Sequence, residues 1–313
     1  MKKVWQQILY ALGLSVLFPL VILVTVQGTV PVRSQPPGET TCPTEETEET
    51  KETVPEQTIP VLEDGEITQM ALETYVTRVV LAEMPVSFEP EALKAQAVVA
   101  RTYALYRVQV SQKHPQGAVC TDYTCCQAYQ KEENYTDADL KQIRDAVMAT
   151  AGQVLTYGGR LAETTYFSCS GGMTEDAKDV WGSDIPYLRA VSSPGEENAT
   201  HYTDTVTFTL SDFCKKLGVT SANLGAVTYT RGGGVATAVI GGQSFSGQAL
   251  RSKLGLRSTA ATISVSGEQV TVTTKGFGHR VGMSQYGADA MAVTGSSYEE
   301  ILQHYYPGTE LKK

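Results

Sequence analysis

A carboxylate stands at the apolar side of a predicted helix near the start of the folded part of the chain. Hydrophobic residues recur every three or four positions and predict a helix over residues 67–81, which Pro85 ends. Glu83 continues this spacing, so a helix that extends to it places the carboxylate on the apolar face. Burial there raises the pKa of a carboxyl group, as a general acid near neutral pH requires. The alternative is a frayed helix end whose carboxylate turns into water.

An arginine on the next predicted helix is a candidate partner for this carboxylate. Pro90 suits the first turn of a second helix, in which Leu93 and three alanines share one face. Arg101 lies four residues after Ala97, at the edge of that face. If the two helices pack as a hairpin, Arg101 points toward the same cleft as Glu83. The alternative is a surface arginine whose aliphatic stem covers apolar neighbours.

A loop after the second helix carries candidate metal ligands. His114, Cys120 and Cys126 stand at equal spacings of six residues. Imidazole and thiolate together form a typical zinc ligand set, and three protein ligands leave a fourth position for water or a distant group. The competing interpretation is a disulfide among Cys120, Cys125 and Cys126. Cys169 and Cys214 are a further candidate pair, and Cys42 stands apart in an acidic segment.

A glycine-rich run over residues 276–288 has a composition that suits neither a core strand nor an ordinary amphipathic helix. Glycine is favoured where the backbone turns tightly or approaches a ligand closely. The polar residues His279, Gln285 and Tyr286 in the same run predict contacts along a ligand-binding wall. The alternative is a plain turn that precedes a helix.

The remaining patterns place helices first and strands later, which predicts an α+β fold. In that fold a helical N-terminal part carries Glu83 and packs with lobes of mixed or antiparallel sheet. Further helices are expected over residues 136–150, 211–217 and 248–254, with a mostly helical segment over 282–306. The expected hairpins join residues 154–157 with 161–167, 227–230 with 235–240, and 263–265 with 270–274.

The N-terminal region predicts attachment to a membrane. Residues 8–26 are apolar and uncharged, and 19 residues at ~1.5 Å each are enough to span a hydrocarbon core of ~30 Å. The lysines before this segment keep the amino end in the cytoplasm, so the rest lies outside. The alternative is a cleaved signal peptide.

Three regions follow along the chain: an anchor over residues 1–30, a stalk rich in Thr, Pro and Glu over 31–60, and a folded domain over 61–313. Ten acidic residues and one lysine lie between residues 36 and 66, a net charge of −9 that equals the formal charge of the whole protein. The acidic balance thus belongs to a disordered segment, and the composition predicts no nucleic-acid partner.

These motifs together resemble the stage II sporulation protein D (SpoIID/LytB) family, and the resemblance covers nearly all of residues 61–311 in order. The matching runs are residues 81–85, 91–104, 168–175, 179–182, 185–189, 276–288, 297–302 and 304–309.

The resemblance implies a membrane-anchored lytic transglycosylase, a lyase that cuts peptidoglycan glycan strands between N-acetylmuramic acid and N-acetylglucosamine and leaves 1,6-anhydro ends. It implies action after an amidase has removed the stem peptides, beside other membrane-anchored engulfment proteins, on the mother-cell membrane facing the septum during sporulation. The alternative is a non-catalytic, glycan-binding enhancer of an N-acetylmuramoyl-L-alanine amidase. A zinc hydrolase is a weaker alternative, because no second histidine lies near the cysteine loop.

The resemblance also assigns residues. Glu83 matches the catalytic glutamate of the family and Arg101 its essential arginine. Zinc, expected to be structural, falls on His114, Cys120 and Cys126, and Cys125 departs from relatives that have another residue there. The candidate glycan contacts in the middle of the chain are Tyr166, Ser168, Tyr187 and Arg189.

The lytic transglycosylase reaction implied by the family needs only one acidic residue, which agrees with Glu83 as the single candidate acid. Ordinary glycosidases need two carboxylates, one as the acid and one to activate water or attack the sugar. A transglycosylase uses the 6-hydroxyl of the sugar itself as the nucleophile, so one carboxylate suffices. Glu83 would protonate the leaving oxygen and then take the proton from that hydroxyl.

Overall fold

The computed structural model describes residues 57–313, which belong to one compact unit. The predicted anchor over residues 8–26, most of the predicted stalk and Cys42 lie outside the described residues. Within residues 57–313 no helix has both the length and the apolar character needed to cross a bilayer. Helices and several small sheets alternate along the chain, so the predicted α+β class is confirmed.

The described chain begins with a hairpin, which differs from the expected helix over residues 67–81. Strands β1 (Thr58–Glu63) and β2 (Glu66–Ala71) pair antiparallel, and α1 begins only at Leu72 and ends at Glu83. Asp64 and Gly65 form the turn with φ of 51° and 85°, the left-handed conformation that two-residue hairpin turns require. The Asp-Gly pair was therefore the signal for this hairpin.

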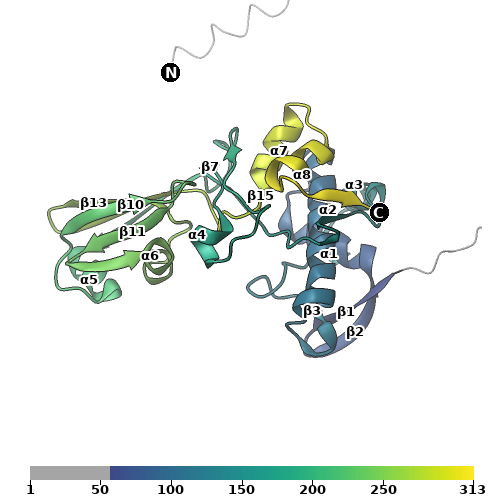
Figure 1. Ribbon diagram of the computed structural model, residues 1–313, viewed down its shortest axis with the longest axis horizontal. Helices are drawn as coiled ribbons and strands as arrows, with labels where there is room; N and C mark the ends of the chain where they lie inside the picture. Colours follow the sequence, from purple (N-terminus) through teal and green to yellow (C-terminus); the bar gives the residue numbers. More distant parts are fainter. Residues whose placement is uncertain (1–56) are drawn as a thin grey trace, which may run out of the picture. The chain divides into compact units, whose positions relative to one another are not determined.

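Helix α2 (Pro90–Tyr106) is the centre of the first hydrophobic core. Helices α1, α3 (Asp137–Ala149), α7 (Gln285–Val293) and α8 (Tyr298–Tyr305) all contact it (Figure 1). All five of its alanines have no exposed surface, so neighbouring helices approach its backbone closely. The predicted second, third and closing helices are confirmed, and α2 is buried on more than one face because it is surrounded.

A second hydrophobic core lies between two antiparallel sheets and two short helices (Figure 1). Helices α5 (Leu210–Leu217) and α6 (Gly247–Leu254) contact one another, and both contact strands of these sheets. The strands are β9 (Thr203–Thr209), β10 (Leu224–Tyr229), β11 (Val235–Ile240), β12 (Gln243–Ser246), β13 (Ala260–Ser266) and β14 (Gln269–Lys275). The β10–β11 and β13–β14 hairpins and both short helices are confirmed predictions.

Further short strands complete the fold, and the two residues of one of them, Tyr166 and Phe167, line the site. The predicted hairpin over residues 154–167 is right only in its first part, because β6 pairs parallel with the distant strand β15. The bounds are β3 (Val119–Cys120), β4 (Val154–Tyr157), β5 (Arg160–Leu161), β6 (Tyr166–Phe167), β7 (Gly172–Met173), α4 (Ala177–Trp181), β8 (Ser192–Ser193), β15 (Met283–Ser284) and β16 (Glu310–Lys312). Single π and 3-10 turns cover Arg107–Ser111, Pro115–Gly117 and Glu132–Asn134.

Candidate active site

Glu83 lies at the last position of α1, where three donors from distant parts of the chain meet its carboxylate. The backbone N–H of Ala128 donates to Oε1 at 2.8 Å, and the Tyr166 hydroxyl reaches the same oxygen at 3.3 Å. The Gln285 amide donates to Oε2 at 3.2 Å. Burial raises the pKa of Glu83, and these hydrogen bonds oppose part of that rise. The expected raised pKa is confirmed, and the carboxylate is held rather than frayed.

The carboxylate of Glu83 opens into a pocket of about 430 Å³, within the ~300–1,000 Å³ usual for ligand sites. Tyr166, Ser168, His279 and Gln285 line it, so four of the seven predicted contacts lie beside Glu83. The remaining lining residues are Tyr103, Tyr123, Cys126, Ala128, Thr165, Phe167, Arg251, Phe277 and Gly278. Within the described residues Glu83 is the one carboxylate of this pocket.

The other three predicted contacts lie elsewhere. Tyr187 is buried, and its hydroxyl accepts a hydrogen bond from the Glu163 backbone at 2.7 Å. Arg189 pairs with Asp184 at 2.7 Å, outside the pocket. The ring of Tyr286 packs edge-on against Phe88, with 5.1 Å between centroids. These three side chains do not line the pocket, and their role as glycan contacts stays a prediction.

Arg101 does not reach the pocket, which corrects the expectation that it points toward Glu83. Its guanidinium is fully buried and binds the Glu73 carboxylate, with 2.6 Å between Nη2 and Oε2. Further hydrogen bonds run to the carbonyls of Val147 and Gln153 at 3.2 and 3.1 Å. Arg101 thus joins α1, α2 and the end of α3. The hairpin argument failed because α2 is buried all round and its edge faces α3.

The glycines of the 276–288 run serve packing within the protein, and this too corrects an expectation. A Cβ on Gly276 would stand 2.6 Å from the carbonyl oxygen of Ser170, and one on Gly278 would stand 2.8 Å from the Cβ of Phe167. Both glycines have positive φ, 81° and 117°. The run therefore lies against residues 167–170, and only its Gly278 backbone lines the pocket beside the side chains already named.

His279 is a half-buried wall residue that stays uncharged. Its ring packs against Phe167 and Trp181, and its Nδ1 accepts the Val281 N–H at 3.1 Å. Burial lowers the pKa of His279 to about 4, and the positive charge of Arg251 lowers it further. A neutral imidazole offers polar contacts in the pocket without competing with Glu83 for a proton at neutral pH.

The cysteine-rich loop brings four candidate metal ligands together. Atoms of His114, Cys120, Cys125 and Cys126 all lie within 4.8 Å of one another. The Nε2 of His114 stands 3.2 Å from the Cys125 sulfur and 3.5 Å from that of Cys126. Ligands about 2.0–2.3 Å from a tetrahedral zinc stand about 3.3–3.8 Å apart, so this donor set fits zinc. All described cysteines are free thiols, so the disulfide alternatives are not formed among them.

This loop is joined directly to the acid. Cys126 lines the pocket, and the next residue, Gln127, donates to the Tyr166 hydroxyl at 2.8 Å. The residue after that is Ala128, whose N–H holds Glu83. The sequence did not indicate that Ala128 holds Glu83, because any residue type supplies a backbone N–H.

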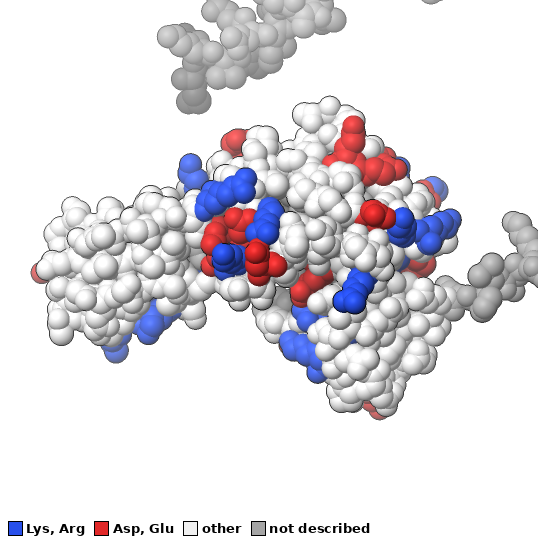
Figure 2. All heavy atoms as spheres, in the orientation of Figure 1, with Lys and Arg blue, Asp and Glu red and all other residues white. Residues whose placement is uncertain are grey.

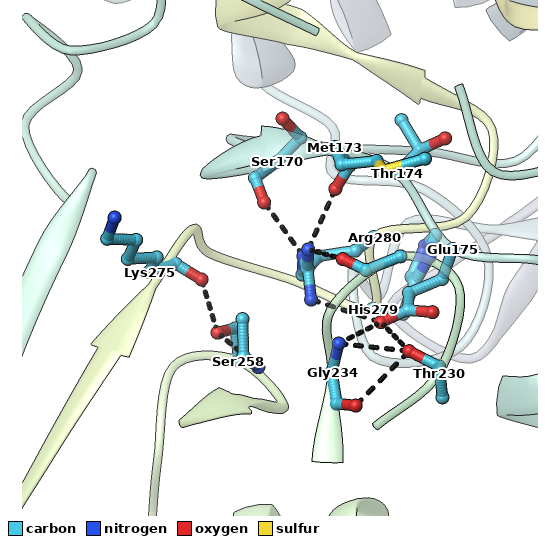
Figure 3. A network of polar contacts seen from close by, with 12 residues as sticks. Ser170, Met173, Thr174, Glu175, Thr230, Gly234, Ser258, Lys275, His279 and Arg280 are labelled. Carbon is cyan, nitrogen blue, oxygen red and sulfur yellow. Dashed lines mark hydrogen bonds and ion pairs between the residues drawn. The ribbon is translucent and has the colours of Figure 1, made fainter. Parts of the chain in front are cut away.

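A buried ion pair fixes the far side of the site (Figure 3). The Arg280 guanidinium binds Glu175 at 3.1 Å and donates to the carbonyls of Ser170, Met173 and Gly232 at 2.7–2.8 Å. Oε1 of Glu175 also accepts the N–H of Gly234 at 2.9 Å. The contacts with residues 232 and 234 attach the β10–β11 turn, and with it the second core, to the wall that carries His279.

Fold and site together define an α+β protein with a single-carboxylate pocket beside a histidine–cysteine cluster. A family model described as "Stage II sporulation protein" matches residues 63–157. The stage II sporulation protein D of Bacillus subtilis is 39% identical over 97% of this chain and 96% of that relative. The chain belongs to the stage II sporulation protein D family.

Two further relatives support this assignment. The stage II sporulation protein D of Bacillus amyloliquefaciens is 44% identical over 79% of this chain and 76% of that relative. A Bacillus subtilis protein named "Amidase enhancer" is 31% identical over 73% of this chain, which covers 39% of that longer relative.

Proposed function

We propose that the protein remodels peptidoglycan in sporulation as a lytic transglycosylase, cleaving the bond between N-acetylmuramic acid and N-acetylglucosamine in strands without stem peptides. The observation that carries this proposal is the position of Glu83, a single held carboxylate with a raised pKa in a ligand-sized pocket. A protonated carboxyl group there is suited to donate to a glycosidic oxygen. The family membership supports the same class of substrate.

In the proposed reaction Glu83 gives its proton to the bridging oxygen, and the bond from that oxygen to C1 of the muramic residue breaks. The 6-hydroxyl of the same sugar attacks C1, and the Glu83 carboxylate takes the hydroxyl proton, so the acid is restored. Gln285 and the Ala128 N–H hold the carboxylate in place through both transfers. Intramolecular attack replaces the water that a second carboxylate would otherwise activate.

The test is digestion of denuded glycan strands and analysis of the products by mass. Wild type and Glu89→Gln, which removes an exposed carboxylate nearby, should both yield 1,6-anhydro ends. Glu83→Gln should yield none while it still binds strands. No anhydro ends from wild type, or undiminished ends from Glu83→Gln, would overturn the proposal.

A second candidate function is a glycan-binding enhancer of an amidase, favoured by the relative named "Amidase enhancer". It predicts that the protein binds strands and stimulates a cell-wall amidase equally well as wild type and as Glu83→Gln. Anhydro ends that depend on Glu83 would exclude a purely non-catalytic role.

We further propose a zinc ion on His114, Cys120 and Cys126, with Cys125 as the fourth ligand. A closed set of one imidazole and three thiolates is typical of structural zinc, which would stabilise the loop that carries Ala128. Metal analysis of the purified chain should give about one zinc, lost in Cys125→Ser and Cys126→Ser and kept in Cys214→Ser. A disulfide between loop cysteines in peptide mapping would contradict this site.

The anchor remains part of the proposal. Residues 8–26 would hold the protein in the mother-cell membrane, with the amino end in the cytoplasm and the pocket outside, facing the septum. There it would act with an amidase and other membrane-anchored engulfment proteins. Protease added to intact cells should remove the folded part, and its full protection would contradict this orientation.

A further inference from the structure

Among the described residues that line the pocket, Arg251 is the one positively charged side chain, because His279 is neutral. It lies on α6, whose Leu250 and Leu254 are buried in the second core, so the helix presents Arg251 on its other side. The second core therefore contributes a charged group to the pocket that contains Glu83. No feature of the sequence marked this residue, because an arginine on a short amphipathic helix is usually a surface residue.

The guanidinium of Arg251 has no acidic partner within residues 57–313. Burial alone lowers its pKa, with no carboxylate opposing the shift. The other buried arginines are compensated: Arg101 by Glu73 and Arg280 by Glu175. On the surface in Figure 2, basic and acidic side chains lie interleaved around α4. Arg257, whose carbonyl accepts the N–H of the pocket residue Gly278, pairs with Asp204 at 3.5 Å. Partial burial of an unpaired guanidinium carries a free-energy cost, because the charge loses water contacts. An anionic ligand bound to it would offset this cost.

The charge of Arg251 acts on one side of the pocket. It contributes to the low pKa of His279, whereas the pKa of Glu83 responds to burial and neutral donors only. Arg251 forms no ion pair with Glu83, and both residues line the same pocket. A ligand whose scissile bond meets Glu83 therefore has a basic side chain in the same pocket.

The attachment of α6 to the pocket is firm. Arg280 and Glu175 bind the turn before β11, a strand that packs against α6, through Gly232 and Gly234 (Figure 3). The N–H of Val235, at the start of β11, donates to the Thr259 carbonyl at 2.8 Å. Arg251 is thus presented to the pocket by a fixed element rather than by a free loop.

The chemistry of the proposed substrate supplies an anion at each muramic residue. Its 3-O-lactyl group ends in an amide when the stem peptide is attached and in a free carboxylate when the peptide has been removed. A guanidinium binds a carboxylate through two parallel hydrogen bonds and gains much less from a neutral amide. We infer that Arg251 binds the lactyl carboxylate of a muramic residue and so makes the pocket selective for strands without stem peptides. This inference rests on the proposed function.

The test measures binding and cleavage with two versions of one substrate. Denuded strands carry free carboxylates, and the same strands treated with carbodiimide and methylamine carry neutral amides. Binding is measured with the full chain carrying Glu83→Gln, alone and combined with Arg251→Met, Arg251→Lys or Lys253→Met. Lys253 is exposed on the same helix and outside the pocket, so its change removes an equal charge.

We expect Arg251→Met to weaken binding of denuded strands about 10- to 100-fold, the worth of one charge-assisted contact, and to abolish the preference over amidated strands. Arg251→Lys should restore part of the preference, and Lys253→Met should change neither value. In the cleaving protein Arg251→Met should raise KM with little change in kcat. Equal preference in wild type and Arg251→Met, or an equal loss with Lys253→Met, would overturn the inference.

The two proposals fail separately. If the Glu83-dependent anhydro ends are absent but Arg251 still sets the preference for carboxylates, the transglycosylase proposal falls and the inference stands. If cleavage depends on Glu83 and ignores the carboxylate, the inference falls and the proposal stands. If no strand binds at all, both fall.

Discussion

The sharpest prediction concerns Arg101, which the family resemblance assigns to catalysis and the structure places in the core. The Arg101 side chain has 0% exposure and that of Glu73 18%, with Nη2–Oε2 and Nε–Oε1 distances of 2.6 and 2.9 Å. Removing one partner of a buried pair costs about 3–5 kcal/mol. Because water reaches Glu73, we expect the lower end, about 3 kcal/mol, for Glu73→Leu. That lowers Tm by roughly 6–12 °C for a domain of this size.

The two residues should behave as a unit. Arg101→Met should cost a similar amount, and Glu73→Leu with Arg101→Met together should cost clearly less than the two separate effects combined. Urea unfolding of the full chain measures all three, with the exposed Glu133→Leu as a control that should leave stability unchanged. The double variant should cost less because it leaves no unpaired buried charge.

Activity then separates a positioning role from a catalytic one. At a temperature where every variant is folded, Glu73→Leu and Arg101→Met should reduce glycan cleavage by similar factors, because both loosen the packing of α1 that ends at Glu83. Loss of all cleavage in a fully stable Arg101→Met, with full activity in Glu73→Leu, would refute this reasoning. It would mean that Arg101 contacts the substrate in a rearranged protein.

Two further predictions concern buried charge. Burial raises the pKa of Glu83, so the folded protein holds this proton more tightly than the unfolded chain, and stability falls as pH rises from the ordinary carboxyl range through the raised pKa. In urea unfolding Glu83→Gln should lack this fall and be at least as stable as wild type near neutral pH; a less stable variant there would contradict it. Arg280→Met leaves Glu175 buried without its partner and should cost about 3–5 kcal/mol, whereas a loss below ~1 kcal/mol would show that the ion pair is not needed.

Local periodicity correctly predicted the position of the Glu83 carboxylate at the end of its helix. The phase of the helix before Glu83 is set by residues within two turns, and Pro85 fixes where the helix ends. Its carboxylate therefore had to lie on the apolar side, whatever packed against it. The Asp-Gly turn was equally local, but the apolar residues that follow it also fit a helical period, and the strand β2 was missed.

The placement of Arg101 and Arg251 depends on contacts that no local pattern contains. The expected helix hairpin places Arg101 beside Glu83, whereas its pairing with Glu73 is set by the packing of α1, α2 and α3. Arg251 lines the pocket from α6 in the second core, and the Arg280–Glu175 pair binds the β10–β11 turn of that same core. Sequence reasoning identifies the chemistry that residues offer, whereas tertiary packing decides which of them meet.

The orientation of Glu83 illustrates what this packing adds. Its three donors come from the cysteine loop, from β6 and from α7, and each alone is an ordinary amide or hydroxyl. Two of the three are connected, since Gln127 binds Tyr166 and precedes Ala128. A change in the loop therefore shifts two hydrogen bonds to the acid at once. Burial raises the pKa of Glu83, and the hydrogen bonds that depend on the loop oppose part of this rise while they hold the carboxylate in position.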